Sequence, residues 1–275
     1  MTHERRRQQG KDQFVIAHVT GMDYAEALAD TAAAFAAALG KSMMLLYVAD
    51  PSLDTLGADE AEQRLAATGR SYVALKGDTR EVVASLPEMF GTVLMVTAVD
   101  PMAPRRNAAN PRTLLRGYLR CRTAYLVLTA PQEPLRAPQR VALSVDYRRE
   151  SKEKMLWASY MARFMGSTVE VCHRDYRDEG LRQKWHNNML FIKKLFSQLG
   201  LKFEQRIVTG RSTRVDIDVL TQLTPNLLIS RTTDIRERDI VDIFAGTQEQ
   251  HLLLHPSRTP LLFLNPRDDL YVLCD

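Results

Sequence analysis

The feature that most constrains the fold of this chain is an internal repeat that covers nearly its whole length. An apolar run, an Ala-rich segment and a second apolar run occur near the start and again about half a chain later. The repeat keeps its register, because the interval from Val15 to Val141 equals the interval from Gly40 to Gly166. A period this long lies far outside the roughly 20 to 50 residues of solenoid repeats. It therefore indicates two copies of a whole domain.

Each half alternates short apolar runs with segments that favour helix. The segment 24–39 consists largely of Ala and Leu, and Gly40 stands where such a helix would end. The expected strands are 14–19, 43–48, 72–75, 93–97 and 125–129 in the first half, and 141–145, 169–172, 203–208, 227–230 and 261–264 in the second. The expected helices are 24–39, 59–67, 80–86 and one beginning at Asn110-Pro111, then 152–165, 179–199, 215–223 and 247–254. The pattern predicts an α/β fold of two tandem doubly wound domains, each a five-stranded, mostly parallel sheet with helices on both faces.

The domain boundaries follow from changes in composition. The Pro-rich segment 132–138 has no periodicity and is the expected linker. The first domain then covers residues 13–131 and the second covers residues 139–266. We expect the basic tail of residues 1–12 to be disordered and residues 267–275 to form a C-terminal tail.

The composition limits the classes of protein to which the chain can belong. It has 275 residues, of which 45% are hydrophobic, and this suffices for two ordinary cores. The net charge of +4 gives only a weak preference for anionic partners. The three cysteines are far apart and lack the C-x-x-C spacing of a zinc site, which fits a reducing cytoplasm. No apolar run has the length of a signal peptide or a membrane span, so we expect a cytoplasmic protein that does not enter membranes.

The end of the second half carries a more specific pattern. The segment 244–247 (Phe-Ala-Gly-Thr) is followed by His255 and then by Thr259-Pro260, just before the last apolar run. This resembles the universal stress protein family, which has Leu-Leu-Gly-Ser, a histidine and Cys-Pro at these places. Gly77 and Gly210, each just after the third expected strand of its half, also fit the family. The resemblance covers nearly the whole chain and is to the tandem, two-domain form.

The resemblance carries expectations about fold and assembly. It implies Rossmann-like domains of the adenine nucleotide alpha hydrolase-like type, packed within the chain as a pseudo-dimer. In the family the last strands of paired domains commonly join, which would bring the strand 125–129 against the strand 261–264. A homodimer is suggested separately by the helix 152–165, whose apolar residues cover more than one face and could pack against a second copy of the chain.

The resemblance further implies where a nucleotide would bind. In nucleotide-binding members an Asp after the first strand contacts adenine, and a G-x2-G-x9-G-[ST] loop holds the phosphates. Asp146 stands at the Asp position and Gly246-Thr247 at the last pair, but the first two glycines are absent. A site for ATP or another adenine nucleotide would then use arginine charge in place of glycine amides. The candidate nucleotide-binding residues are Asp146, Arg231, Thr233, Arg236, Gly246 and Thr247.

These candidates also have a simpler interpretation. Arg231 and Arg236 are interleaved with acidic residues and could belong to a solvated, salt-bridged loop. Asp146 could cap the turn that follows its strand.

In the first half Thr20 replaces the Asp and the loop 99–110 contains no glycine. The sequence therefore predicts that the first half has lost the phosphate loop of the family.

Other charged residues suggest weaker hypotheses. Arg112, Arg116 and Arg120 recur every four residues before the fifth strand, with Arg105 and Arg106 nearby. Such a stripe could bind an acidic partner or another anion, or contact the phosphates of RNA or DNA. No aromatic residues interleave with it, so a solvated face is the preferred interpretation and nucleic acid is disfavoured. His251 and His255 lack a third ligand, so no metal is predicted. No catalytic constellation can be placed.

The sequence leads to one main hypothesis and two alternatives. The main hypothesis is a cytoplasmic, non-enzymatic stress-response protein that binds a ligand or partner, with a degenerate nucleotide site surviving at most in the second domain. The first alternative is an ATP-binding protein with slow ATPase activity. The second is a nucleic-acid-associated regulator that uses the arginine stripe.

Overall fold

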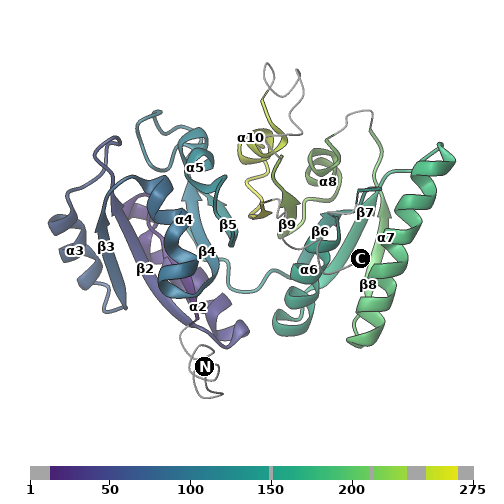
Figure 1. The fold of residues 1–275 in the computed structure, drawn as a ribbon, viewed down its shortest axis with the longest axis horizontal. Coiled ribbons are helices and arrows are strands. Elements are labelled where there is room, and N and C mark those ends of the chain that lie inside the picture. The colour runs from purple at the N-terminus through teal and green to yellow at the C-terminus, as the bar shows by residue number, and fades with distance from the viewer. Residues whose placement is uncertain (1–12, 149–150, 211–213, 234–245, 266–275) are drawn as a thin grey trace. The chain divides into compact units, whose positions relative to one another are not determined.

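The chain folds into two compact units, which meet in sequence between Arg136 and Ala137, inside the Pro-rich segment. The computed structural model describes residues 13–148, 151–210, 214–233 and 246–265 (Figure 1). The expected tails, 1–12 and 267–275, lie outside the described residues. We refer to residues 1–136 as unit 1 and to residues 137–275 as unit 2, and describe each by itself.

Unit 1 is a parallel sheet covered by helices on both faces. Its strands are β1 (Phe14–His18), β2 (Ser42–Ala49), β3 (Tyr72–Lys76), β4 (Thr92–Val99) and β5 (Ala124–Thr129), in the order β3-β2-β1-β4-β5. All four pairings are parallel. Its helices are η1 (Met22–Tyr24), α2 (Ala25–Leu39), α3 (Ala58–Ala66), α4 (Thr79–Phe90) and α5 (Pro111–Tyr118). In Figure 1 α4 lies in front of this sheet and α2 lies behind it.

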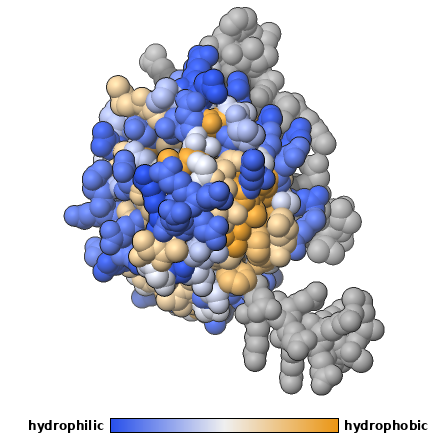
Figure 2. Space-filling view, turned by 90° about the vertical axis from the view of Figure 1, so that its left-hand side faces the viewer, coloured by the Kyte–Doolittle hydropathy of each residue, from blue (hydrophilic) through white to orange (hydrophobic). Residues whose placement is uncertain are grey.

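The apolar runs account for this arrangement. The side chains of β1 after Phe14 are all buried, as is every residue of β5, because strands covered on both faces contact apolar layers above and below. The Ala-rich α2 packs closely on β1 and β2, and Gly40 ends it with a φ of 64° in the left-handed region. The outer helix α3 buries only Ala61 and Leu65. The side of unit 1 on which α3 and β3 lie is accordingly mostly hydrophilic (Figure 2).

Unit 2 repeats this topology. Its strands are β6 (Arg140–Ser144), β7 (Thr168–His173), β8 (Phe203–Ile207), β9 (Leu227–Arg231) and β10 (Leu261–Leu264), in the order β10-β9-β6-β7-β8. These pairings are parallel as well. The described helices are α6 (Ser151–Met165), α7 (Glu179–Gln198), α8 (Val215–Leu223) and α10 (Gln248–Leu253). The predicted fold, two tandem doubly wound α/β domains, is confirmed.

The differences from the expected elements are small and have local causes. α4 continues past Pro87 to Phe90, four residues beyond the expected end, and Gly91 ends it with a φ of 56°. α5 begins at Pro111 with Asn110 as its cap, as predicted, but it ends at Tyr118. Arg120 therefore lies beyond the helix on which the stripe was expected. In the described parts of the chain, no helix combines the length and apolar character that a membrane span requires.

The strand order indicates at which edge of each sheet a ligand-binding crevice is expected. In unit 1 the chain moves from β1 outward to β2 and β3, and then crosses to β4 on the other side of β1. Loops that follow neighbouring strands diverge at such a switch point and leave a crevice at the carboxyl ends of the strands. In unit 2 the same switch lies between β6 and β9.

Candidate ligand-binding site

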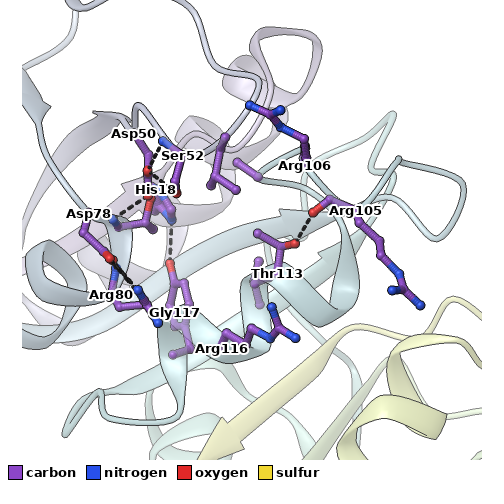
Figure 3. A pocket seen from close by; sticks show the side chains of 15 residues that line it. His18, Asp50, Ser52, Asp78, Arg80, Arg105, Arg106, Thr113, Arg116 and Gly117 are labelled. Atoms are coloured by element: carbon purple, nitrogen blue, oxygen red, sulfur yellow. Dashed lines mark hydrogen bonds and ion pairs between the residues drawn. The ribbon is translucent and has the colours of Figure 1, made fainter.

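A cavity of about 340 Å³ opens at the carboxyl edge of unit 1 (Figure 3). Three loops contribute to it, those that follow β2, β3 and β4, and α5 closes one side. Its floor contains His18 from the end of β1 and Tyr118 from the end of α5. The remaining lining residues are Asp50, Ser52, Leu53, Asp78, Thr79, Arg80, Arg105, Arg106, Ala108, Thr113, Leu114, Arg116 and Gly117.

The floor of the cavity is polar but uncharged. His18 is only 2% exposed, and its Nδ1 lies 2.8 Å from the hydroxyl of Tyr118. Burial lowers the pKa of His18 to about 4, so the imidazole is neutral at pH 7. Burial also raises the pKa of Tyr118 well above its usual value, so its hydroxyl keeps the proton. The pair therefore adds no charge to the floor of the cavity.

The two carboxylates that line the cavity are occupied by hydrogen bonds within the protein. Asp50, 4% exposed, accepts from the backbone N (2.9 Å) and Oγ (2.6 Å) of Ser52 and from the backbone N of Thr79 (2.8 Å). Burial alone would raise the pKa of Asp50, but these hydrogen bonds outweigh it and hold the pKa below its usual value. Asp78 caps α4 through the backbone N of Arg80 (2.8 Å) and pairs with the Arg80 guanidinium (2.6 Å), whose hydrogen bonds lower the pKa of Asp78.

The arginines of the cavity fall into two classes. Arg80 is paired with Asp78, and Arg106 lies 3.4 Å from Asp54 in a solvent-exposed ion pair. Arg105 and Arg116 are exposed, and neither forms an ion pair within the part of the chain that the structure describes. These two guanidinium groups are available to a ligand.

The loop between β4 and α5 is well organised although it lacks glycine. The side-chain amide of Asn110 donates to the carbonyl of Ala103 (2.7 Å), and the Thr113 hydroxyl donates to the carbonyl of Arg105 (2.6 Å). The backbone N of Asp54, in the loop after β2, donates to the carbonyl of Arg106 (2.7 Å). These bonds hold the backbone of Arg105 and Arg106 at the mouth of the cavity before any ligand arrives.

Several of the candidate nucleotide-binding residues of the second half form hydrogen bonds with neighbouring residues. Asp146 Oδ1 accepts from the backbone N of Arg148 (3.0 Å), which is the turn-capping role that the simpler interpretation assigns to it. Thr233 donates through its backbone N (3.2 Å) and its hydroxyl (2.9 Å) to the carboxylate of Glu249, which is 1% exposed. The carbonyl of Gly246 accepts from Arg214 (2.6 Å).

The other predicted residues of unit 2 complete this picture. Thr247 immediately precedes α10, at the N-cap position, but makes no capping hydrogen bond through its side chain. Arg231 is the last residue of β9 and is partly buried, with interactions of its own. Arg236 lies outside the described residues. A nucleotide role for these residues stays a prediction.

The arginine stripe is divided by the fold. Arg112 and Arg116 both belong to α5, but only Arg116 lines the cavity, and Arg120 follows the end of the helix. His18 and Asp50 are not among the site residues that the sequence predicts. A usable signal is nevertheless present, because both are polar residues at or just beyond the end of a buried apolar run.

The fold was compared with solved structures. A universal stress protein from Archaeoglobus fulgidus superposes with a TM-score of 0.63 at 12% identity, covering 92% of this chain and 97% of the other. A putative universal stress protein from Pseudomonas aeruginosa gives a TM-score of 0.61 at 13% identity and covers 97% of each chain. The chain has the universal stress protein fold.

The likeness to universal stress proteins is one of architecture, since identity at this level shows the fold alone. No protein-family model and no curated protein matches the sequence. The same fold also occurs in the cytoplasmic domain of a prokaryotic cation chloride cotransporter, with a TM-score of 0.53 at 13% identity and coverage of 95% of this chain and 100% of that domain. The universal stress protein fold is therefore used in more than one setting, and function has to be argued from the cavity.

Proposed function

We propose that this protein is a binding protein of the universal stress type and that unit 1 holds a small anionic molecule in its carboxyl-edge cavity. The observation that carries the proposal is that Arg105 and Arg116, at the mouth of a cavity with an uncharged floor, form no ion pair with any residue that the structure describes. Guanidinium binds phosphate or carboxylate through two parallel hydrogen bonds, which gives both affinity and orientation. An adenine nucleotide is the first ligand to test.

The size and character of the cavity support this proposal. A volume of about 340 Å³ lies within the range of about 300 to 1,000 Å³ that is typical of small-molecule sites. Apolar side chains such as Leu53 and Leu114 line it beside the polar groups. A ligand with an uncharged body and one anionic end would match both parts.

The proposal is one of binding without turnover. A general base must keep a free lone pair within reach of its substrate. Asp50 and Asp78 accept hydrogen bonds from Ser52, Thr79 and Arg80, which supports a structural role for both carboxylates. Slow ATP hydrolysis and nucleic-acid binding remain the alternatives. A cytoplasmic location, the pseudo-dimer of units and a homodimer stay predictions.

The test is calorimetric titration of AMP and of ATP into the intact chain and into Arg116→Ala. We expect one or both nucleotides to bind and Arg116→Ala to weaken binding about tenfold or more, because a charge-assisted hydrogen bond contributes about 1.5 to 3 kcal/mol. Arg120→Ala is the matched control, since it removes the same charge from a residue outside the cavity. Equal binding by the intact chain and Arg116→Ala, or no binding of either nucleotide, would contradict the proposal.

A further inference from the structure

We propose that the ligand of the unit 1 cavity is a phosphate monoester bound without a divalent cation, not a magnesium-bound triphosphate. The inference rests on the anion site proposed above and concerns what kind of anion it takes. Three features of the cavity carry it. They are the hydrogen bonds that its carboxylates already accept, the number of its arginines that lack an ion pair among the described residues, and the hydrogen bonds that the first amides of α4 and α5 already make.

Hydrogen bonds within the protein already occupy most acceptor positions of the two carboxylates that could hold Mg²⁺. Mg²⁺ at phosphate sites is usually held by one or two carboxylates together with phosphate oxygens. Asp50 accepts two hydrogen bonds at Oδ1 and one at Oδ2. Asp78 accepts from the backbone N and Nε of Arg80 at Oδ1 and from Nη2 at Oδ2. A metal ion would have to displace bonds that also cap α4.

The free positive charge matches one phosphoryl group. A phosphate monoester carries about −1.5 to −2 at pH 7, which the two guanidinium groups of Arg105 and Arg116 balance. A triphosphate carries more charge, which Mg²⁺ ordinarily neutralises. The other two arginines of the cavity are already paired with Asp78 and Asp54.

The arrangement of the side chains places this charge at one side of the cavity. In Figure 3 the side chains of Arg105 and Arg116 extend toward the same side, with Thr113 between them, whereas Arg80 lies beside Asp78 on the other side. His18 lies between Asp50 and the α5 residues, away from the free guanidinium groups. A ligand would then direct its phosphate toward α5 and its uncharged body toward His18.

The backbone does not supply the amides that a polyphosphate chain needs. Phosphate chains bind at helix N-termini whose N–H groups are free, often after a glycine-rich loop. The first amides of α4 donate to Asp50 and Asp78, and those of α5 donate to the side chain of Asn110 (3.0 and 3.4 Å). The loop 99–110 contains no glycine. Phosphate recognition therefore falls to side chains, and among the described residues Arg105 and Arg116 are the lining arginines without an ion pair.

The experiment compares ligands that differ only in their phosphates. Adenosine, AMP, ATP, ribose 5-phosphate and inorganic phosphate are titrated into the full chain, each with excess Mg²⁺ and again with EDTA. We expect AMP to bind at least about tenfold more tightly than adenosine, with the same Kd in Mg²⁺ and in EDTA, and Mg²⁺-bound ATP to bind about tenfold more weakly than AMP.

Variants assign the effect to the two arginines. Arg105→Ala and Arg116→Ala should each weaken AMP binding, and the double variant should bind AMP no better than adenosine. Arg112→Ala, on the same helix but outside the cavity, should bind AMP like the intact chain. A thermal melt of each variant without ligand shows whether its fold is intact.

The outcomes separate the two proposals. If Mg²⁺-bound ATP binds more tightly than AMP and Arg116→Ala abolishes that binding, the anion site stands and the monoester inference is wrong. If AMP binding requires Mg²⁺, the inference is wrong as well. If none of the phosphates binds, or all bind equally to the double variant, the proposed site itself fails.

Discussion

The two units share one topology but use the carboxyl edge of the sheet in different ways. In unit 1 this edge surrounds a cavity and leaves the guanidinium groups of Arg105 and Arg116 without an ion pair among the described residues. In unit 2 several described polar groups at the same edge bond to one another: Thr233 to Glu249, Ser230 and Gln248 to Asp216, and Arg174 to Asp218. The comparison teaches that one apolar pattern builds both sheets, while a few polar side chains decide what each edge can do.

Unit 2 also buries two ionisable side chains that form hydrogen bonds. Asp216 is 1% exposed and accepts hydrogen bonds from Ser230 and Gln248. Lys154 is 6% exposed and donates to Ser144 Oγ at 3.0 Å. Burying an ionised group is costly unless hydrogen bonds replace its water. These contacts tie the described side chains at this edge of unit 2 into its folded structure.

The largest expected difference between the units is in their response to acid. In unit 1, His18 has its pKa lowered from 6.5 to about 4 by burial, so the unfolded chain binds a proton that the folded chain excludes. The contribution of neutral His18 to the free energy of unfolding is complete above pH 6.5. It is lost as the pH falls toward 4, a change of about 3 kcal/mol. The contribution of Asp50, whose pKa is lowered from 3.8, is lost only below about pH 3.8 and does not overlap with this window.

Urea unfolding followed by circular dichroism at pH 7, 5.5 and 4.5 measures the effect of His18. His18→Gln should flatten the change between pH 6.5 and 4. Both tryptophans, Trp157 and Trp185, belong to unit 2, so tryptophan fluorescence reports on that unit separately. A variant with the same pH dependence as the intact chain would refute the assignment to His18.

The second prediction compares two glycines at equivalent places. Gly77 and Gly210 have φ values of 155° and 153°, which alanine adopts only with strain. A Cβ on Gly77 would have its nearest contact 3.7 Å away, at Val82, but a Cβ on Gly210 would lie 2.6 Å from Arg174 and 2.7 Å from Asp218. Gly210→Ala must also displace this ion pair. We expect Gly77→Ala to lower the free energy of unfolding by about 1 kcal/mol and Gly210→Ala by about 2 to 3 kcal/mol.

Urea unfolding with two probes distinguishes these variants. Gly210→Ala should shift the tryptophan fluorescence transition of unit 2, and Gly77→Ala should appear mainly in the circular dichroism transition. Equal losses for the two variants would show that backbone strain alone decides the cost and that the Arg174–Asp218 pair moves aside freely.

The smallest expected effect concerns Asp146, the residue for which the sequence suggested both a cap and an adenine contact. Because Asp146 accepts a hydrogen bond from the backbone N of Arg148, Asp146→Ala should lower stability by about 0.5 to 1.5 kcal/mol. The Asp146→Ala variant should bind AMP with the same affinity as the intact chain. A tenfold loss of affinity would instead place a nucleotide site in unit 2 and reverse the comparison between the units.

Much of the fold could be predicted because its signals are local. The helix 215–223 and the strand 261–264 were predicted at their observed bounds, since a run of apolar residues needs no distant partner to be recognised. Asn110 and Pro111 similarly marked the start of α5. The end of α5 was harder to place, because arginine is compatible with both a helix and the turn that follows it.

The candidate site could be predicted only in part. Arg116 was singled out for its spacing with Arg112 and Arg120, although only Arg116 faces the cavity. The absence of glycine from the loop 99–110 pointed away from a phosphate site in the first half. That interpretation considered backbone amides, and it overlooked side chains that three separate loops bring together.

The sequence by itself determined the duplication, the doubly wound α/β class and most element boundaries, because hydrophobic periodicity and glycine placement act over a few residues. Only the tertiary structure decided where a ligand could bind. His18, Asp50, Arg80 and Arg105 come from different strands and loops, and they line one cavity because parallel strands place all their carboxyl ends at the same edge of the sheet. Which cations are left without partners depends on pairings such as Arg80 with Asp78, and those pairings exist only once the chain has folded.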